Sequence, residues 1–459
     1  MTDPPLRKAS DAPPWRADRA SLSLNRARKD GLCLLLLGGV VLVFFGIAME
    51  NASRVSMLDF KAVYYGARCL MGHGDPYQES EILRVYQADG GQFPADPIGS
   101  RLVHEAVALC VNLPTALCYL APMALLPFAI AQSLWTVLTA GCIVLASILI
   151  WDLGADFAPV LSGALIGLLL ANSEMLLMVG NLAGVVIGLC AAAVWCFLRG
   201  RFVALGIVLL AVSLALKPHD AGLVWLYFLL AGGVHRRRAL QTLPIAVLLA
   251  LPALLWVWHI APHWVREWHA NLCITSAHGG LNDPGMAASG AHAVGMTINL
   301  QSALSYFRDD PRFYDPASYL VCIPLLLLWA WVTLRFRWTP ARAYLALADV
   351  AALTLLPAYH RPYDAKLLLL TVPACALLWA ERGVLGRAAL WVSVAGIVLT
   401  GDPWAILLGM VGNSHLATGV GTGRLLTAIQ VFPAPAMLLA VGVFYLWVYM
   451  RRRRVSEEV

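Results

Sequence analysis

Long apolar segments separated by short polar ones run through most of the chain. The pattern predicts helices near residues 31–49, 128–150, 158–172, 181–198, 202–216, 220–233, 243–260, 318–334, 343–358, 365–380, 387–411 and 432–450. A helix needs about 20 apolar residues to cross a bilayer, so the shorter segments must be extended, tilted or partly buried in protein. The pattern therefore predicts an all-α polytopic membrane protein with about 12 transmembrane helices.

Composition and charge agree with this prediction. Of the 459 residues, 60% are hydrophobic and 13% are charged, whereas a soluble domain is roughly 25% charged. The net charge of +6 is divided among short basic clusters between apolar segments, which is typical of membrane topology signals. We therefore expect a lipid bilayer as the environment and no nucleic acid as a partner.

The basic clusters also predict an orientation. They lie at residues 26–29, 199–201, 236–238, 335–342, 382–387 and 451–454. All six face the cytoplasm if the proline-containing segment 107–126 makes no net crossing. Residues 1–29 and 451–459 are then cytoplasmic tails, 30–450 form the membrane domain, and two long loops, about 50–106 and 261–317, lie outside. We expect a multi-pass protein of the inner (cytoplasmic) membrane with its active face on the non-cytoplasmic, periplasmic side, because functional groups are often placed on loops.

Asp59 is the first candidate on that outer side. It follows the first apolar segment closely and so lies near the membrane interface. A carboxylate in a half-apolar setting has an adjustable proton affinity, which suits a general base. The alternatives are a helix cap or an ion-pair partner for Lys61 or Arg68.

Two polar strings between apolar segments give further candidates. Lys217 and His219 interrupt one pair of segments, where an ammonium is costly and Lys217 suits a phosphate; the alternative is a lysine that reaches the head groups. The string from Tyr359 to Lys366 contains His360, the more informative residue, whereas Arg361 and Lys366 fit interfacial anchors. Glu174 is a second-rank candidate.

Other recognisable chemistry is missing from the sequence. There is no P-loop, dinucleotide-binding, serine-hydrolase or zinc-protease motif, and the histidines of the second outer loop lack regular metal-ligand spacing. We therefore expect no cofactor and no metal site. Cys69 and Cys273 lie in the two long loops, where pairing in an oxidising compartment is one alternative to free thiols.

Several strings, in order, resemble the GT87 glycosyltransferase family, formerly DUF2029. The resemblance covers roughly residues 31–380. The first outer loop carries it in Asp59-Phe60 through Tyr64-Tyr65, Gly72 and Gly74-Asp75-Pro76-Tyr77. Later strings resemble the family's Tyr-Pro-Pro, Gly-Gln, Lys-Pro-Gln and final motifs: Asn112-Leu113-Pro114 with Leu120-Ala121-Pro122, Gly180-Asn181, Lys217-Pro218-His219, and His360 with Tyr363-Asp364.

The resemblance implies a GT-C type fold. It also implies an inverting transferase that moves a sugar, typically mannose, from a polyprenyl-phosphate-linked donor to a glycolipid or glycan acceptor. Asp59 matches the family's catalytic base. Asn112, Asn181 and His219 depart from the family's aromatic, Gln and Gln residues, which bears on the identity of the sugar and acceptor.

The resulting hypothesis assigns roles to a small set of residues. Asp59 removes a proton from the acceptor hydroxyl, while Lys217 and His360 stabilise the departing phosphate without a metal. The candidate lining residues are Tyr64, Tyr65, Asn181, His219, Tyr363 and Asp364. The alternatives are a transporter or lipid flippase, whose coupling residues belong near the bilayer midplane, and another GT-C activity such as an O-antigen ligase or polymerase.

Overall fold

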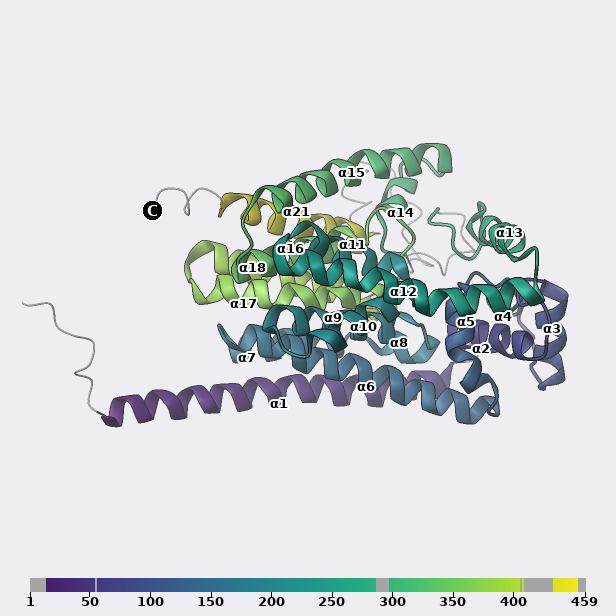
Figure 1. The fold of residues 1–459 in the computed structure, drawn as a ribbon, viewed down its shortest axis with the longest axis horizontal. Coiled ribbons are helices and arrows are strands. Elements are labelled where there is room, and N and C mark those ends of the chain that lie inside the picture. The colour runs from purple at the N-terminus through teal and green to yellow at the C-terminus, as the bar shows by residue number, and fades with distance from the viewer. Residues whose placement is uncertain (1–13, 54–55, 286–296, 405–406, 408–431, 453–459) are drawn as a thin grey trace, which may run out of the picture.

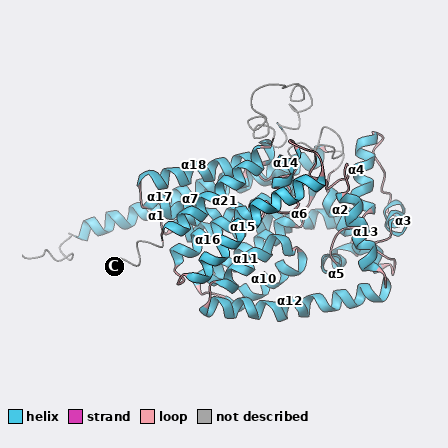
Figure 2. Cartoon of the chain, turned by 90° about the horizontal axis from the view of Figure 1, so that it is seen from above, coloured by secondary structure: helices cyan, strands magenta, loops and turns pink. Residues whose placement is uncertain are grey.

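The computed structural model describes residues 14–53, 56–285, 297–404, 407 and 432–452. Every regular element in these ranges is a helix (Figure 2). Each predicted apolar helix has a counterpart, although the one expected at 387–411 ends at Leu399, and residues 405–406 and 408–411 lie outside the description. The ends of both predicted tails, 1–13 and 453–459, also lie outside it. From Pro14 onward the N-terminal tail belongs to the first helix.

Five helices of the described chain are long and apolar enough to cross a bilayer. They are α1 (Pro14–Ala52, with the apolar stretch Leu24–Ala52), α6 (Phe128–Ala155), α12 (Gly233–Ile260), α15 (Pro311–Arg335) and α21 (Pro433–Arg451). In Figure 1, α1 and α15 lie along opposite edges of the molecule. Large apolar side chains such as Leu248 of α12 and Leu320 of α15 are exposed on these helices. Such faces are suited to lipid, so the chain is a membrane-embedded helical protein.

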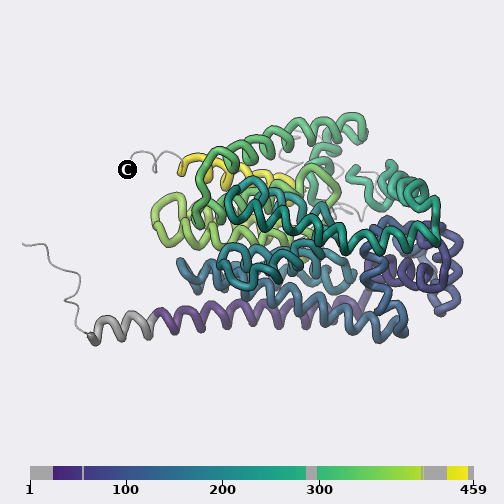
Figure 3. The backbone as a smooth tube through the Cα atoms, viewed as in Figure 1, coloured from purple at the N-terminus to yellow at the C-terminus, as the bar shows by residue number. Residues whose placement is uncertain are grey.

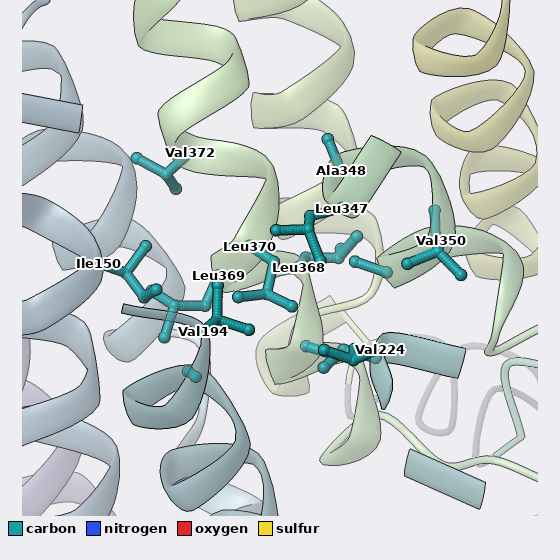
Figure 4. Close-up of a cluster of buried hydrophobic side chains, with 14 of the residues drawn as sticks. Ile150, Val194, Val224, Leu347, Ala348, Val350, Leu368, Leu369, Leu370 and Val372 are labelled. Carbon is teal, nitrogen blue, oxygen red and sulfur yellow. The ribbon is translucent and has the colours of Figure 1, made fainter. Parts of the chain in front are cut away.

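Shorter helices fill the space between the long ones. They are α7 (Pro159–Leu170), α8 (Glu174–Val179), α9 (Ala183–Arg199), α10 (Val203–Leu216), α11 (Pro218–Leu230), α14 (Leu300–Ser305), α16 (Pro340–Leu353), the 3₁₀ helix η1 (Asp364–Thr371), α17 (Val372–Ala380) and α18 (Gly383–Leu399). Figure 4 shows Leu368, Leu369 and Leu370 of η1 in the core, among Val194 of α9 and Leu347 of α16. Helices η1, α16 and α17 are therefore largely covered by protein, which is one of the arrangements expected for the shorter apolar segments.

Helices α1 and α7 approach each other through glycines. A β-carbon placed on Gly38 would lie 2.3 Å from the carbonyl oxygen of Gly167, and one on Gly163 would lie 1.9 Å from that of Gly31. Neither distance is sterically allowed, so both contacts require a residue without a side chain. Small residues allow membrane helices to approach closely and gain dispersion energy. This contact fixes the Arg28-proximal half of the apolar stretch of α1 against the bundle.

The predicted outer loop 50–106 is itself helical. It contains α2 (Leu58–Met71), α3 (Glu79–Ala88) and α4 (Pro97–Ala108), which pack with α5 (Pro114–Ala124) and α13 (Trp264–Ser276). Figure 3 shows this group gathered at one end of the molecule. It has its own apolar core, which includes Phe60, Tyr64 and Trp135. At 11 residues, α5 is too short to span a bilayer of about 30 Å.

The basic clusters gather at the opposite end. Arg28 forms an ion pair with Asp156 at 3.1 Å, and Asp156 is bound by Arg199 at 2.7 Å. The guanidinium of Arg238 donates to the carbonyl of Phe197 at 2.7 Å. One cavity is lined by Arg335, Arg337, Arg342, Arg451 and Arg452, and another by Ala27, Arg382 and Arg387. Six clusters far apart in sequence thus share one end of the bundle.

Candidate functional site

The start of α2 is held against the turn between α8 and α9. Met57 has a left-handed backbone (φ 55°), and its N–H donates to the carbonyl of Met178 at 2.7 Å. The turn contains Gly180, also left-handed at φ 66°, whose carbonyl accepts from the indole of Trp135 at 2.8 Å. These contacts set Asp59, in the first turn of α2, beside Asn181.

Asn181 fixes the Asp59 carboxylate. Its Nδ2 donates to Oδ2 of Asp59 at 2.7 Å, and its Oδ1 accepts from the backbone N–H of Ala183 at 2.8 Å. The second bond determines which way the amide faces, because only Oδ1 can accept. Among the partners considered from sequence, Arg68 instead pairs with Asp89 at 3.1 Å. The cap position of α2 is occupied by Met57, so Asp59 is not its N-cap.

We expect Gly180→Ala to destabilise the protein more than Gly200→Ala. Both glycines have φ 66°, where a side chain costs about 1–2 kcal/mol. A β-carbon at Gly180 would also lie 2.8 Å from Cβ of Phe60 and 3.0 Å from Sδ of Met57, whereas none of the described atoms would meet one at Gly200 within 4 Å. Unfolding in SDS titrations measures the difference. Equal losses would show that the contact between Gly180 and α2 is unimportant.

A second group of charged residues surrounds Lys217, at the junction of α10 and α11. The ammonium of Lys217 is bound to Oδ1 of Asp364 and lies 2.9 Å from Oδ2 of Asp220. Both carboxylates are almost fully buried. The ring of Tyr363 lies below the ammonium, 5.5 Å from Nζ. Lys217 is therefore not a lysine that reaches into the head groups but one held between two acids.

Two histidines lie beside these acids. Nε2 of His360 is 3.5 Å from Oδ1 of Asp220, and Nε2 of His219 is 3.8 Å from the same oxygen. The ring centres are 5.3 Å apart. The His360 side chain is buried at 1% exposure, whereas that of His219 is 46% exposed. The group is therefore open on the His219 side.

The segment 359–364 connects Asp59 with the lysine group. Burial alone would lower the pKa of Arg361, but Tyr359, Tyr363 and Asp59 hold it above the usual value. Burial raises the pKa of Tyr363, and the negative charge of Asp59 raises it further. Arg361 also donates from its backbone N–H to Oδ2 of Asp364 at 2.9 Å. Asp59 and Lys217 thus act on the same short segment from two sides.

The structure does not bring Tyr64 and Tyr65 into this arrangement. The hydroxyl of Tyr64 donates to the carbonyl of Leu126 at 2.6 Å, and that of Tyr65 donates to Asp89 at 3.3 Å. Both rings pack against Phe128 in the core of the outer layer. Tyr64 and Tyr65, which were expected to line the site, therefore pack in the core of the outer layer.

Lys366 and Glu174 lie in another buried group. The Lys366 ammonium is bound to the carbonyl of Asn172 and lies 3.4 Å from Asp402, whose other oxygen accepts from the N–H of Met175 at 2.7 Å. Lys366 is therefore not an interfacial anchor. Burial raises the pKa of Glu174, at the start of α8, to about 7. These contacts tie the turn between α7 and α8 to η1 and to the segment that follows α18.

The cysteines of the outer loops are free. Cys69 is buried in α2, whereas Cys273 is exposed on α13 next to His269, at 3.6 Å from Nδ1. The alternative of a Cys69–Cys273 disulfide is therefore not realised in the structure.

Sequence reasoning undervalued Asp220, Arg361 and Asp402. Asp220 follows His219 directly in the string around Lys217, and this adjacency was the signal that could have raised its rank. Arg361 interacts electrostatically with Asp59, and Asp402 contacts Lys366. Both partners lie far away in the sequence, so no neighbouring residue indicated either Arg361 or Asp402. Comparisons with protein-family models, curated proteins and solved structures find no match for this chain.

Proposed function

We propose that this protein is a membrane glycosyltransferase of GT-C type. It moves a sugar, in the first instance mannose, from a polyprenyl-phosphate donor to a hydroxyl of a lipid-linked or periplasmic acceptor. The observation that carries the proposal is the convergence of four distant strings. Asp59, Asn181, Lys217 and the segment 359–364 are the strings that resemble the GT87 motifs. Asp59 is hydrogen-bonded to Asn181, Lys217 is bound to Asp364, and the charge of Asp59 acts on Tyr363.

The proposed reaction is a direct displacement. The acceptor hydroxyl gives its proton to Asp59 as its oxygen attacks the anomeric carbon. The bond from that carbon to the phosphate oxygen breaks, and the polyprenyl phosphate leaves with the electron pair, so the anomeric configuration inverts. Asn181 occupies Oδ2 of Asp59 and thereby directs Oδ1 toward the acceptor. A positioned base of this kind contributes roughly 10²- to 10⁴-fold in rate.

The phosphate is assigned to the cationic side of the site. Lys217, His360 and Arg361 are the groups with the required chemistry, since charge-assisted hydrogen bonds to phosphate are strong. The two acids beside Lys217 oppose the binding of a phosphate. One ammonium faces two carboxylates, so this group has an excess negative charge while the imidazoles are neutral. Further positive charge at this position is required before a phosphate is bound well.

The proposed active face is the non-cytoplasmic one. Arg28 and the other basic clusters lie at one end of the bundle, while α2 begins beyond the opposite end of α1. The helix rises roughly 36 Å over the 24 steps from Arg28 to Ala52, about the thickness of a membrane core. If the basic end faces the cytoplasm, as the charge rule requires, Asp59 lies on the outer side, in the inner membrane of the cell envelope.

The test is transfer by the purified protein in liposomes. Radiolabelled polyprenol-phosphate-mannose, with arabinose and glucose donors in parallel, is mixed with extracted membrane lipids as acceptors. We expect label to move from one donor to an acceptor in proportion to the amount of protein. Absence of transfer from all three donors overturns the proposal. Movement of a labelled solute or lipid across the same vesicles then identifies a transporter or flippase.

A further inference from the structure

Three ligand-type side chains meet at one point next to Lys217. The side chains of His219, Asp220 and His360 each place one nitrogen or oxygen within 4.8 Å of the other two. Oδ1 of Asp220 is 3.5 Å from Nε2 of His360 and 3.8 Å from Nε2 of His219. Ligand atoms about 2.0–2.1 Å from a tetrahedral zinc ion are roughly 3.4 Å apart. Small side-chain rotations therefore suffice to bring the three atoms onto one metal ion.

The hydrogen bonding of His360 aims a lone pair at Asp220. Nδ1 of His360 is 3.1 Å from the carbonyl oxygen of Ala358, which can only accept, so Nδ1 carries the proton. In the neutral ring, Nε2 then presents its lone pair to Oδ1 of Asp220. Nε2 of His360 and Oδ1 of Asp220 are buried and make no hydrogen bond of normal geometry. Two facing electron pairs repel each other in such a place unless a cation lies between them.

A metal ion between His219, Asp220 and His360 accounts for these contacts better than a second proton on His360. A second proton on His360 would satisfy one imidazole, but Nε2 of His219 is aimed at the same oxygen. One ion between the three atoms satisfies all of them. It also compensates the excess negative charge left by Lys217, Asp220 and Asp364.

The surroundings match those of a metal-binding site. A ligating histidine usually donates its other nitrogen to a carbonyl or carboxylate, and the carbonyl of Ala358 occupies that position for His360. Asp220 is supported in the same way, because its second oxygen lies 2.9 Å from the Lys217 ammonium. Two histidines and one carboxylate with an open fourth position are a known ligand set of catalytic zinc. The 46% exposure of His219 provides the entry path.

We propose that His219, Asp220 and His360 bind one divalent ion of the zinc class, with a fourth position open on the His219 side. The expectation of a metal-free protein rested on the absence of regular ligand spacing in the sequence. That spacing cannot reveal a ligand set completed by a residue 140 positions away. Metal binding is independent of the proposed transferase activity. If both hold, Nε2 of His360 binds the ion in place of the phosphate, and the ion supplies the additional positive charge that the phosphate requires.

The test measures metal on the protein without any substrate. Tag-free protein is stripped with a chelator, incubated with Zn²⁺ and desalted, and its metal content is determined by mass spectrometry. We expect about one zinc ion per chain. Co²⁺ in its place should give the visible absorption of a tetrahedral site. Stripped protein that retains its fold but takes up neither ion overturns the proposal, whatever the result of the transfer assay.

His219→Ala is the decisive variant, because a half-exposed side chain can be removed with little effect on folding. We expect its Zn²⁺ affinity, from competition with a chromophoric chelator, to fall by more than the roughly 10- to 100-fold that loss of a second-shell partner costs. His360→Gln should behave in the same way. His104→Ala is the matched control, since His104 also lies beside a carboxylate, 3.0 Å from Glu79, but has no second imidazole. Unchanged affinity in both site variants overturns the assignment.

Discussion

Asp59→Asn should reduce sugar transfer by about 10²- to 10⁴-fold, the usual contribution of a positioned general base. Asparagine has the same shape as aspartate, and its carbonyl oxygen can still accept from Nδ2 of Asn181, which donates to Asp59 at 2.7 Å. The substituted side chain, however, cannot take the acceptor's proton. We therefore expect a fall in kcat with little change in the KM for the donor, because the donor phosphate is bound by other residues.

The measurement is initial transfer rate in liposomes at saturating donor, with an SDS unfolding titration to verify the fold. Glu79→Gln is the matched control, since Glu79 is a half-exposed acid of the same outer layer, paired with His104 at the surface. The control should transfer at the wild-type rate. A loss of less than about tenfold in Asp59→Asn would assign the base to another group and leave Asp59 a positioning role.

Lys217→Met should lower the free energy of unfolding by about 3–5 kcal/mol, the cost of breaking a buried ion pair from one side. Methionine fills a similar volume, but Asp220 and Asp364, at 1% and 2% exposure, lose the ammonium that compensates both charges. Uncompensated buried carboxylates are costly because water cannot solvate them. The effect is large because one cation is shared by two acids.

SDS titration of the purified protein measures this loss, and Lys29→Met, at an exposed lysine, is the control. The double variant Lys217→Met with Asp364→Asn should be more stable than Lys217→Met alone, because one of the two uncompensated charges is also gone. A loss of less than about 1 kcal/mol in Lys217→Met, as for an exposed pair, would show that water or another cation solvates the two carboxylates.

The candidate site was predicted in part. Asp59, Asn181, Lys217, Asp364, His219 and His360 were singled out, and the structure pairs Asp59 with Asn181, Lys217 with Asp364, and His219 with His360. The family resemblance predicted Tyr64 and Tyr65 as site residues, but their hydroxyls donate to the carbonyl of Leu126 and to the carboxylate of Asp89. A string shows which residues are neighbours along the helix, whereas the face that each presents depends on what packs against it.

The helical segments and the separation of charge were predictable from the amino-acid sequence. Each apolar run predicts a helix because a backbone in lipid must satisfy its hydrogen bonds internally, and this constraint is local. The clusters around Arg28, Arg199 and Arg451 were likewise readable as one group, because alternating helices return the chain to the same end. Both properties depend on residue type and position along the chain alone.

The pairing of the charges, in contrast, depends on the three-dimensional packing of the helices. Asn181 reaches Asp59 across 122 residues, and Lys217 reaches Asp364 across 147. The free energy of a buried charge depends on whether a partner lies within a few ångströms, and such distances follow from the packing of several helices. For the same reason the sequence predicted Lys217 as a phosphate ligand or a lysine that reaches the head groups, and it indicated no protein partner for His360. In the folded protein, Lys217 is held between two acids and His360 shares Asp220 with a second histidine.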